Sequence, residues 1–321
     1  MNIVLKIKLF RSILYQYLND IKINKGEQIR FYNFWNSQIP SDMWLARFIQ
    51  HRGLIQKYSG KINFYSVLGN VIFLKYRRRG VNIFFSGENI HANRFAKYRK
   101  VCEQNPFDLS IGFERTNLET FVRFPLWILF MFEPESTYED IKEKVNRLSN
   151  VNIDARTKFC SLVASHDWNG IRGEVIESLQ SIDFVCSGGN YKENTNELHT
   201  TFKNNKHEFI KQFKFNICPE NSNTIAYVTE KIFQAIEAGC IPIYWGSDNK
   251  PEQDILNQEA ILFWNQKGDN TKTINFIEEL VVDKMKYIDF ASQQRFLPGA
   301  PEIIWNYFKI LENKLKDVIN K

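Results

Sequence analysis

Short apolar runs recur along the chain, and they constrain its fold more than any other feature of the sequence. Successive positions in these runs are apolar, so both faces of each expected strand would be buried. This is typical of parallel strands in a sheet that helices cover on both sides. The runs are IRFYNF (29–34), KINFYSV (61–67), VNIFFSG (81–87), LSIGF (109–113), FCSLVAS (159–165), DFVCSGG (183–189), FKFNIC (213–218), IPIYWG (241–246) and AILFW (260–264).

Segments between these runs have the spacing of amphipathic helices. In two of them, apolar residues recur every three or four positions. These residues are Ile171, Val175, Ile176 and Leu179 in the first segment, and Ile274, Ile277, Leu280 and Val281 in the second. Strands that alternate with helices predict βαβ units, so we expect two α/β halves.

The length of the chain also favours two domains. A chain of 321 residues is long for a single core and suits two domains of about 100–200 residues each. A charged, Pro-containing segment, FEPESTYEDIKEKVNRLSN, lies between the two series of runs and indicates a divide near 135–155. We expect an N-terminal domain over 1–150, a second domain over 151–300 and a C-terminal helix over 301–321.

Composition excludes a largely disordered chain and indicates an anionic partner. Hydrophobic residues make up 44% of the chain and aromatic residues 15%, which is ample for packed cores. The formal charge of +6 favours a nucleotide, a membrane surface or a nucleic acid and does not choose among them. The five cysteines are scattered without a CxxC pair, so we expect reduced thiols, a cytoplasmic protein and no metal site.

The N-terminal segment does not have the pattern of a signal peptide or of a membrane span. Lys6, Lys8 and Arg11 interrupt its apolar residues. A weak peripheral contact with the inner membrane, through this basic segment and through Lys314 and Lys316, is a secondary expectation.

Polar clusters follow several of the expected strands. They are SGEN after VNIFF, SHDWNGIR after FCSLVA, SGGN after DFVC and PENSN after FKFNIC. Ligands of open parallel sheets bind at the carboxyl ends of the strands, so these clusters are expected to gather at such an edge. A helix that begins near Tyr227 would place Glu230 and Lys231 in or near its first turn, where free backbone N–H groups suit a phosphate.

These clusters contain the groups that a transfer reaction with a diphosphate leaving group requires. Arg172 and Lys231, on two different turns, can neutralise the leaving diphosphate without a metal ion, and the chain has no DxD sequence to hold one. A sugar hydroxyl that attacks needs a general base, and Glu88, directly after a strand of the first half, is the candidate.

Each of these residues also has a purely structural interpretation. Glu88 could cap a turn, Glu230 and Lys231 could be solvated charges of a helix surface, and Arg172 could belong to a structural ion pair. Asn221 commonly makes turns and helix caps. Spacing alone leaves both interpretations open.

The stretch FKFNICPENSNTIAYVTEKIFQAIEAGCIPIYWGS closely resembles the signature of the α-1,3/4-fucosyltransferases of glycosyltransferase family ten, in particular the bacterial enzymes that decorate lipopolysaccharide. The order ENS, YVTEKI, IPIYWGS and its spacing are long enough to be highly specific. Shorter matches flank it in the expected order: FFSGEN, FDLSIGFE, VRFPLW, the turn that holds VAS and Arg172, and SGGN.

This resemblance implies a GT-B fold, with two Rossmann-like domains that face each other across a cleft. It also implies inverting transfer of L-fucose from GDP-β-L-fucose to O3 or O4 of GlcNAc in a glycan such as N-acetyllactosamine, without a metal cofactor. By the resemblance, Glu88 is the base. The diphosphate ligands are Arg172 and Lys231, and the donor-pocket residues are Asn221, Tyr227 and Glu230.

The sequence departs from the family pattern at several places. Pro219 replaces the usual aromatic residue before ENS, and His166 replaces the common Asn after VAS. The C-terminal heptad repeats of some bacterial relatives are missing, so their contacts are not carried over. We expect the C-terminal helix to pack back on the first domain through an apolar stripe of Ile303, Trp305 and Phe308 with Leu311.

Two alternatives differ in function. One is a GT-B transferase that uses another nucleotide sugar, and the other is a basic, non-catalytic protein that binds glycans or nucleic acid. Against nucleic acid, the basic residues are dispersed and no recognition motif occurs. Loops over 35–80 and 91–107 are expected on the acceptor side, with Trp35, Trp44 and Tyr65 as aromatic candidates.

Overall fold

The computed structural model describes residues 3–34, 39–149 and 156–321, with the side chains of the first helix from residue 7 onward. The chain divides into two compact units. The first contains Met1–Ser136 and Asn306–Lys321, and the second contains Thr137–Trp305. The expected domain boundary at 150/151 and the candidate Trp35 lie outside the described residues.

The first unit contains a five-stranded parallel sheet. Its strands stand in the order β1-β2-β3-β4-β5, which is also their order along the chain. Both faces carry buried apolar side chains, such as Phe64 on one face and Tyr65 on the other, as a sheet covered on two sides requires. The strands are β1 (Ile29–Tyr32), β2 (Ile62–Tyr65), β3 (Val81–Phe85), β4 (Leu109–Gly112) and β5 (Phe121–Arg123).

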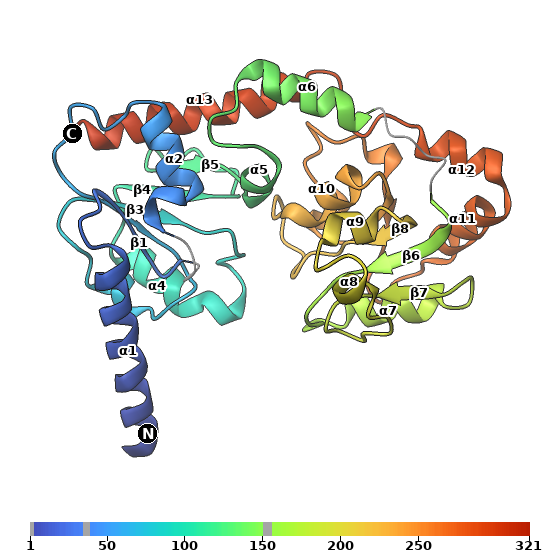
Figure 1. Cartoon of the computed structure of the whole chain (residues 1–321), viewed down its shortest axis with the longest axis horizontal. Helices are drawn as coiled ribbons and strands as arrows, with labels where there is room; N and C mark the ends of the chain where they lie inside the picture. Colours follow the sequence, from blue (N-terminus) through green and yellow to red (C-terminus); the bar gives the residue numbers. More distant parts are fainter. Residues whose placement is uncertain (1–2, 35–38, 150–155) are drawn as a thin grey trace. The chain divides into compact units, whose positions relative to one another are not determined.

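Helices accompany this sheet, and the last helix of the chain returns to it. The helices are α1 (Ile3–Ile23), α2 (Trp44–His51), α3 (Ile72–Lys75), α4 (Ala96–Gln104), α5 (Leu126–Met131) and α13 (Ala300–Ile319) (Figure 1). On α13, the ring of Phe308 packs edge-to-face against Trp44, Phe48 and Phe124 at centroid distances of 5.7, 6.1 and 5.6 Å. The prediction that the C-terminal helix packs on the first unit is therefore confirmed.

The apolar stripe of α13 differs from the predicted one. Its buried residues include Ile304, Phe308, Leu311 and Leu315, at positions i, i+4, i+7 and i+11. Ile303 and Trp305 are only half-buried, so the prediction was wrong at these two positions. The helical period explains the error, because residues one position to either side of Ile304 point about 100° away from the core.

A buried carboxylate lies where α1 meets the sheet of the first unit. Asp20 is buried, and its Oδ2 atom has no hydrogen-bond partner among the described residues. Burial raises the pKa of Asp20 to about 6, although Arg78 and Gln16 oppose the shift. The free energy of unfolding is therefore expected to fall as the pH rises from about 4 to about 6, because the unfolded chain releases this proton first.

Asp20→Asn is expected to stabilise the protein at pH 8 by about 1 kcal/mol, after allowance for solvent screening, and by less at pH 5. The amide removes the cost of a buried charge without a change in size. Melting temperatures of the wild type and the variant at the two pH values measure the effect. The exposed Asp42→Asn variant serves as control. An equal gain in melting temperature at both pH values would contradict the raised pKa of Asp20.

The second unit contains another five-stranded parallel sheet, with the order β10-β9-β8-β6-β7. The chain starts in β6, moves outward to β7, and then crosses to the other side of β6 to form β8. The strands are β6 (Lys158–Leu162), β7 (Val185–Ser187), β8 (Phe213–Ile217), β9 (Ile241–Tyr244) and β10 (Leu262–Phe263). The point where the strand order reverses therefore lies between β6 and β8.

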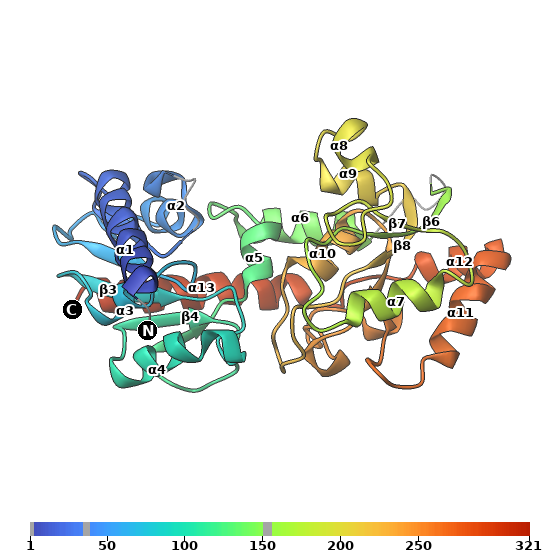
Figure 2. The ribbon, with the colours of Figure 1, turned by 90° about the horizontal axis from the view of Figure 1, so that it is seen from below.

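Helices cover both faces of this sheet. The helices of the unit are α6 (Tyr138–Ser149), α7 (Ile171–Leu179), α8 (Glu197–Thr200), α9 (Lys206–Ile210), α10 (Glu230–Glu237), α11 (Thr271–Val282) and α12 (Lys284–Ala291). On one face, α7, α11 and α12 share a core cluster with the strands, and α11 and α12 lie side by side (Figure 1, Figure 2). Phe209 and Ile210 of α9 pack with Cys186 and Phe213 in a separate cluster.

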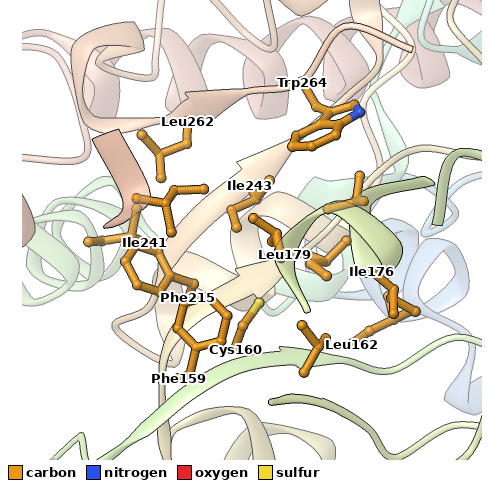
Figure 3. Packing of buried hydrophobic residues seen from close by; sticks show 14 of the residues in the cluster. Phe159, Cys160, Leu162, Ile176, Leu179, Phe215, Ile241, Ile243, Leu262 and Trp264 are labelled. Carbon is orange, nitrogen blue, oxygen red and sulfur yellow. The ribbon is translucent and has the colours of Figure 1, made fainter. Parts of the chain in front are cut away.

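The first of these clusters shows why the strand sequences are apolar at successive positions. Ile176 and Leu179 of α7 face Leu162 and Ile243 of the sheet (Figure 3). Every residue of β9 is buried, including Ile241. Burial of each such side chain stabilises the fold by about 1.5–3 kcal/mol relative to exposure, so this core fixes the strands whose ends carry the polar loops.

Candidate functional site

The reversal of strand order in the second unit places two polar loops next to each other. The loop after β6 leads into α7 and holds Arg172, and the loop after β8 holds Glu220 and Asn221. Since β6 and β8 are hydrogen-bonded neighbours, their carboxyl ends are adjacent. This is the position where open α/β sheets bind ligands.

Arg172 connects the two loops. One of its terminal nitrogens donates a hydrogen bond to Oδ1 of Asn221 at 3.0 Å. The other donates to the backbone oxygen of His166 and lies 3.3 Å from its Nδ1 atom. These contacts use up to three of the five N–H groups of a guanidinium. The structure thus brings the predicted residues Arg172 and Asn221 into direct contact across 49 positions of sequence.

A fully buried carboxylate organises the start of α10. Glu220 has an exposed fraction of 0% and accepts hydrogen bonds from the backbone N–H and the hydroxyl of Thr229, both at 2.7 Å. It also accepts one from Nζ of Lys231 at 3.3 Å. Lys231 in turn donates to the hydroxyl of Thr229 at 2.7 Å, so its ammonium is fixed by two partners. A buried charge pair of this kind requires such additional hydrogen bonds.

Gly246, which follows β9, makes room for this carboxylate. A Cβ atom at this position would lie 2.7 Å from Cγ of Glu220 and 3.0 Å from the hydroxyl of Tyr244. Its φ of 139° is also one that L-residues rarely adopt. Because Gly246, the glycine of IPIYWGS, has no Cβ atom, it leaves the space that the buried side chain of Glu220 occupies.

The charges around Lys231 are coupled. Burial lowers the pKa of Lys231, but Glu220 and Glu230 outweigh it, and the pKa lies above its ordinary value. Burial raises the pKa of Glu220, against the effect of Lys231. Burial also acts to raise the pKa of Glu230, but Lys231 and Lys206 lower it below its ordinary value. Burial lowers the pKa of Arg172, and Asp167 and Glu220 oppose that shift.

The start of α10 differs from the prediction in two ways. The helix begins at Glu230 and not near Tyr227, because Ala226 has a φ of 65° and Thr229 is extended. Glu230 and Lys231 nevertheless fall in its first turn, as predicted. The amide of Thr229, which precedes this turn, donates to Glu220. A carboxylate of the chain itself therefore occupies part of the position where a phosphate was expected.

The remaining predicted residues of this unit lie close to the same cluster. Glu230 is half-buried and its Oε1 lies 3.5 Å from Nζ of Lys231. The side chain of Tyr227 is 1% exposed, and it is close enough to Arg172 to affect its pKa. All five predicted residues of the second unit thus belong to one neighbourhood.

Glu88 belongs to the first unit and follows β3 at its carboxyl end. Its side chain is 30% exposed and forms an ion pair with Arg94. The hydroxyl of Ser86 donates to the backbone oxygen of Glu88 at 2.7 Å and accepts from its amide at 3.2 Å, which fixes the turn. The carboxylate is therefore accessible and held on a defined turn.

Sequence reasoning missed three residues next to these side chains. It gave no role to Glu220, although this residue precedes Asn221 in the motif. Lys206, at the start of α9, donates to Gln234 at 2.7 Å and contributes to lowering the pKa of Glu230. Trp168 is 65% exposed and stacks on His166 with a centroid distance of 3.6 Å. Lys206 lies 25 positions before Lys231, and no local sequence pattern relates the two residues. Their proximity is therefore visible only in the fold.

Within residues 3–34, 39–149 and 156–321, no group of three or more His, Cys, Asp or Glu side chains is arranged to hold a metal ion. The structure holds no disulfide among the described cysteines: Cys102 is half-buried, and Cys160, Cys186, Cys218 and Cys240 are buried free thiols.

Glu220→Gln is expected to make binding of GDP, the ligand that the sequence resemblance predicts, sensitive to alkaline pH. The carboxylate raises the pKa of Lys231, so in its absence burial is expected to lower that pKa and the ammonium deprotonates earlier. GDP affinity of the variant should fall by about tenfold per pH unit above the new pKa, while that of the wild type stays level. Calorimetric titrations from about pH 7.5 to 9.5 measure this.

Glu197→Gln, which disrupts the Lys158–Glu197 pair elsewhere in the same unit, is the matched control. Its pH profile should follow the wild type. Parallel profiles for all three proteins would show that Glu220 does not act through Lys231.

Two parallel-sheet α/β units, with a cationic site at the strand reversal of the second, have the architecture of GT-B glycosyltransferases. Solved structures agree: a crystal structure of an α1,3-fucosyltransferase matches 93% of this chain and 97% of its own, with a TM-score of 0.57 and 22% identity. A crystal structure of such an enzyme with GDP-fucose matches with a TM-score of 0.56 and 21% identity, over 93% of this chain and 97% of that one. The predicted GT-B fold is confirmed.

Family comparison identifies the group within this class. The N-terminal domain of α-(1,3)-fucosyltransferase FucT matches residues 29–130, and the C-terminal domain of glycosyltransferase family 10 (fucosyltransferase) matches residues 153–306. The chain belongs to the fucosyltransferases of glycosyltransferase family 10, as its motifs predict.

Curated relatives agree with this assignment. An α-(1,3)-fucosyltransferase FucT of Helicobacter pylori is 30% identical over 233 residues, which are 64% of this chain and 45% of that protein. An α-(1,4)-fucosyltransferase of Arabidopsis thaliana is 28% identical over 89 residues, 28% of this chain and 22% of that protein. The chain thus spans less than half the length of these two relatives.

Proposed function

We propose that this protein transfers L-fucose from GDP-β-L-fucose to a hydroxyl of a glycan acceptor, with inversion at the anomeric carbon. The observation that carries the proposal is the cluster of Arg172, Lys206 and Lys231 at the strand reversal of the second unit, in a chain of this family. In this assignment the second unit binds the donor and the first unit binds the acceptor.

Each predicted residue has a role in the proposed reaction. Glu88 accepts the proton of the acceptor hydroxyl as its oxygen bonds to C1 of fucose. The bond from C1 to the phosphate oxygen breaks at the same time, and GDP leaves with the electron pair. Arg172 and Lys231 stabilise the charge on the departing diphosphate. Asn221, Tyr227 and Glu230 form the donor pocket.

The cationic cluster supports a reaction that needs no divalent metal. Three basic side chains can neutralise a diphosphate, and each is held by a partner already present in the protein: Arg172 by Asn221, Lys231 by Glu220 and Lys206 by Gln234. Such preorganised donors do not need to rearrange when charge develops, which is the main source of electrostatic catalysis. Transfer is therefore expected to proceed in the presence of a chelator.

The proposed acceptor is a glycan with a free O3 or O4 on GlcNAc, such as N-acetyllactosamine, and the proposed location is the cytoplasm. The structure describes two of the aromatic candidates for acceptor contact, Trp44 and Tyr65. Trp44 stacks on Phe48 at 5.2 Å, and Tyr65 is 1% exposed and stacks on Tyr32 at 5.0 Å. Tyr65 is thus a core residue and does not contact the acceptor, whereas Trp44 is half-buried and stays a candidate.

One incubation tests the proposal. The purified protein is mixed with GDP-fucose, N-acetyllactosamine and a chelator, and the product is analysed by NMR. We expect an α-L-fucoside, whose linkage the spectrum identifies. Thermal shifts with GDP, UDP and CMP distinguish the other donors, because the true donor's nucleotide stabilises most. Larger stabilisation by UDP or CMP would contradict GDP-fucose as donor, and salt-sensitive DNA binding without turnover would favour the non-catalytic alternative.

A further inference from the structure

Helix α1 of the first unit carries an exposed apolar stripe. Ile7, Phe10, Leu14, Leu18 and Ile21 are between 43% and 65% exposed. They recur at intervals of three or four residues, so they share one face of the helix. Large apolar side chains that are exposed singly need no explanation, but a continuous row of five marks an interaction surface.

The opposite face of α1 already has its partners in the first unit. Gln16 bonds to Asn33, and it accepts from the amide of Asn70 at 2.9 Å. Directly after the helix, Asn24 pairs with the backbone of Phe31 at 2.8 and 2.9 Å. The C-terminal half of α1 is thus fixed to the unit, while its first turns project beyond the sheet (Figure 1). The apolar stripe is therefore not the face that anchors the helix.

The charged residues beside the apolar stripe indicate which kind of partner it binds. Lys8, Arg11 and Lys22 are exposed, and helical geometry places them along one edge of the stripe. Asp20 is the one acidic residue in the sequence of α1, and it is buried. Two copies of this helix that packed stripe to stripe would therefore bring like charges together without acidic partners. A negatively charged surface, in contrast, would attract the basic residues along this edge of α1.

No helix within the described residues combines the length and the apolar character that crossing a bilayer requires. An amphipathic helix with basic residues beside its apolar face instead lies in the plane of the interface. We propose that α1 binds the surface of a membrane that contains anionic lipids. Its stripe of Ile7, Phe10, Leu14, Leu18 and Ile21 enters the acyl-chain boundary, and Lys8, Arg11 and Lys22 contact lipid phosphates.

The sequence predicts membrane contact through the basic N-terminal segment and through Lys314 and Lys316. The contact proposed here uses only the first of these. Nζ of Lys314 donates to the backbone oxygen of Glu119 at 2.8 Å, so this ammonium is engaged within the first unit. Helical geometry places the exposed aromatic ring of Tyr15 on the same edge as the basic residues, and tyrosine is favoured at the depth of lipid headgroups. The proposal does not depend on the catalytic role of any residue.

Co-sedimentation of the full chain with vesicles tests the apolar stripe. The wild type should bind vesicles with about 30 mol% phosphatidylglycerol and release from them as salt rises. The double variant Phe10→Ser, Leu14→Ser should bind at least about tenfold more weakly. Phe184→Ser, Val282→Ser is the matched control, because it removes two apolar side chains that are 56% and 85% exposed in the second unit.

The charges are tested in the same assay. Lys8→Gln, Arg11→Gln, Lys22→Gln should lose most of the preference for anionic over pure phosphatidylcholine vesicles. A control that removes three exposed lysines elsewhere in the first unit, Lys57→Gln, Lys97→Gln, Lys100→Gln, should keep it. Transfer to a small soluble acceptor should be unchanged in all α1 variants, so failure of the membrane proposal is distinguishable from failure of the enzymatic one.

Two results would overturn the membrane proposal. One is a vesicle assay in which the wild type does not bind, or in which the α1 variants and their controls lose binding equally. The other is a dimer in light scattering without lipid that the Phe10→Ser, Leu14→Ser variant converts to a monomer. That outcome would assign the stripe to a second copy of this chain.

Discussion

Glu88→Gln is expected to lower the rate of fucose transfer by about 10²- to 10⁴-fold, the contribution of a positioned general base. The amide keeps the size of the side chain, but it cannot accept the proton of the acceptor hydroxyl. GDP affinity should stay unchanged, since Glu88 belongs to the first unit and the cationic cluster to the second. Steady-state kinetics together with calorimetric titration of GDP measure both quantities.

A matched control separates loss of the base from loss of an ion pair. Glu88 is paired with Arg94, and Glu103 on α4 is paired with Arg99 in the same unit. Glu103→Gln should therefore retain full activity. A Glu88→Gln variant that turns over at the wild-type rate would remove Glu88 as the base.

Lys231→Met is expected to weaken GDP binding by about 30- to 1,000-fold, or about 2–4 kcal/mol. Methionine keeps much of the length of the side chain and removes the charge that faces the diphosphate. The same substitution leaves Glu220 buried without its cation, which is expected to cost about 3–5 kcal/mol of stability. The single variant alone would therefore not distinguish a binding defect from a folding defect.

The double variant Lys231→Met, Glu220→Gln resolves this ambiguity. It removes both members of the buried pair, so the melting temperature should recover towards that of the wild type. GDP affinity should stay low, because the diphosphate still lacks its cation. Lys211→Met, at an exposed position after α9, is the control for a lost positive charge. Recovery of GDP affinity in the double variant would show that Lys231 has a structural role only.

Much of the fold followed from the apolar runs, because a parallel strand leaves its signature in consecutive residues. All nine expected runs contain a strand, from β1 to β10 with the exception of β5. β5 (Phe121–Arg123) was missed because Arg123 and Pro125 interrupt the apolar residues around it, so they do not form an uninterrupted run. Its register comes from pairing with β4, which no local pattern encodes.

The candidate site was less accessible to sequence reasoning. Contact between Arg172 and Asn221 follows from a general rule, that loops after neighbouring strands meet at the reversal of strand order. Burial of Glu220 does not follow from any such rule, since a glutamate in a polar motif is ordinarily exposed. Its burial depends on the missing Cβ of Gly246 and on the donors of Thr229, which the fold brings together.

A crystal structure of this protein with GDP tests the central claim most directly. We expect the guanidinium of Arg172 and Nζ of Lys231 both to lie within about 3.2 Å of oxygens of the same diphosphate, at the carboxyl ends of β6 and β8. A diphosphate that contacts neither side chain, or that binds away from this edge of the sheet, would contradict it.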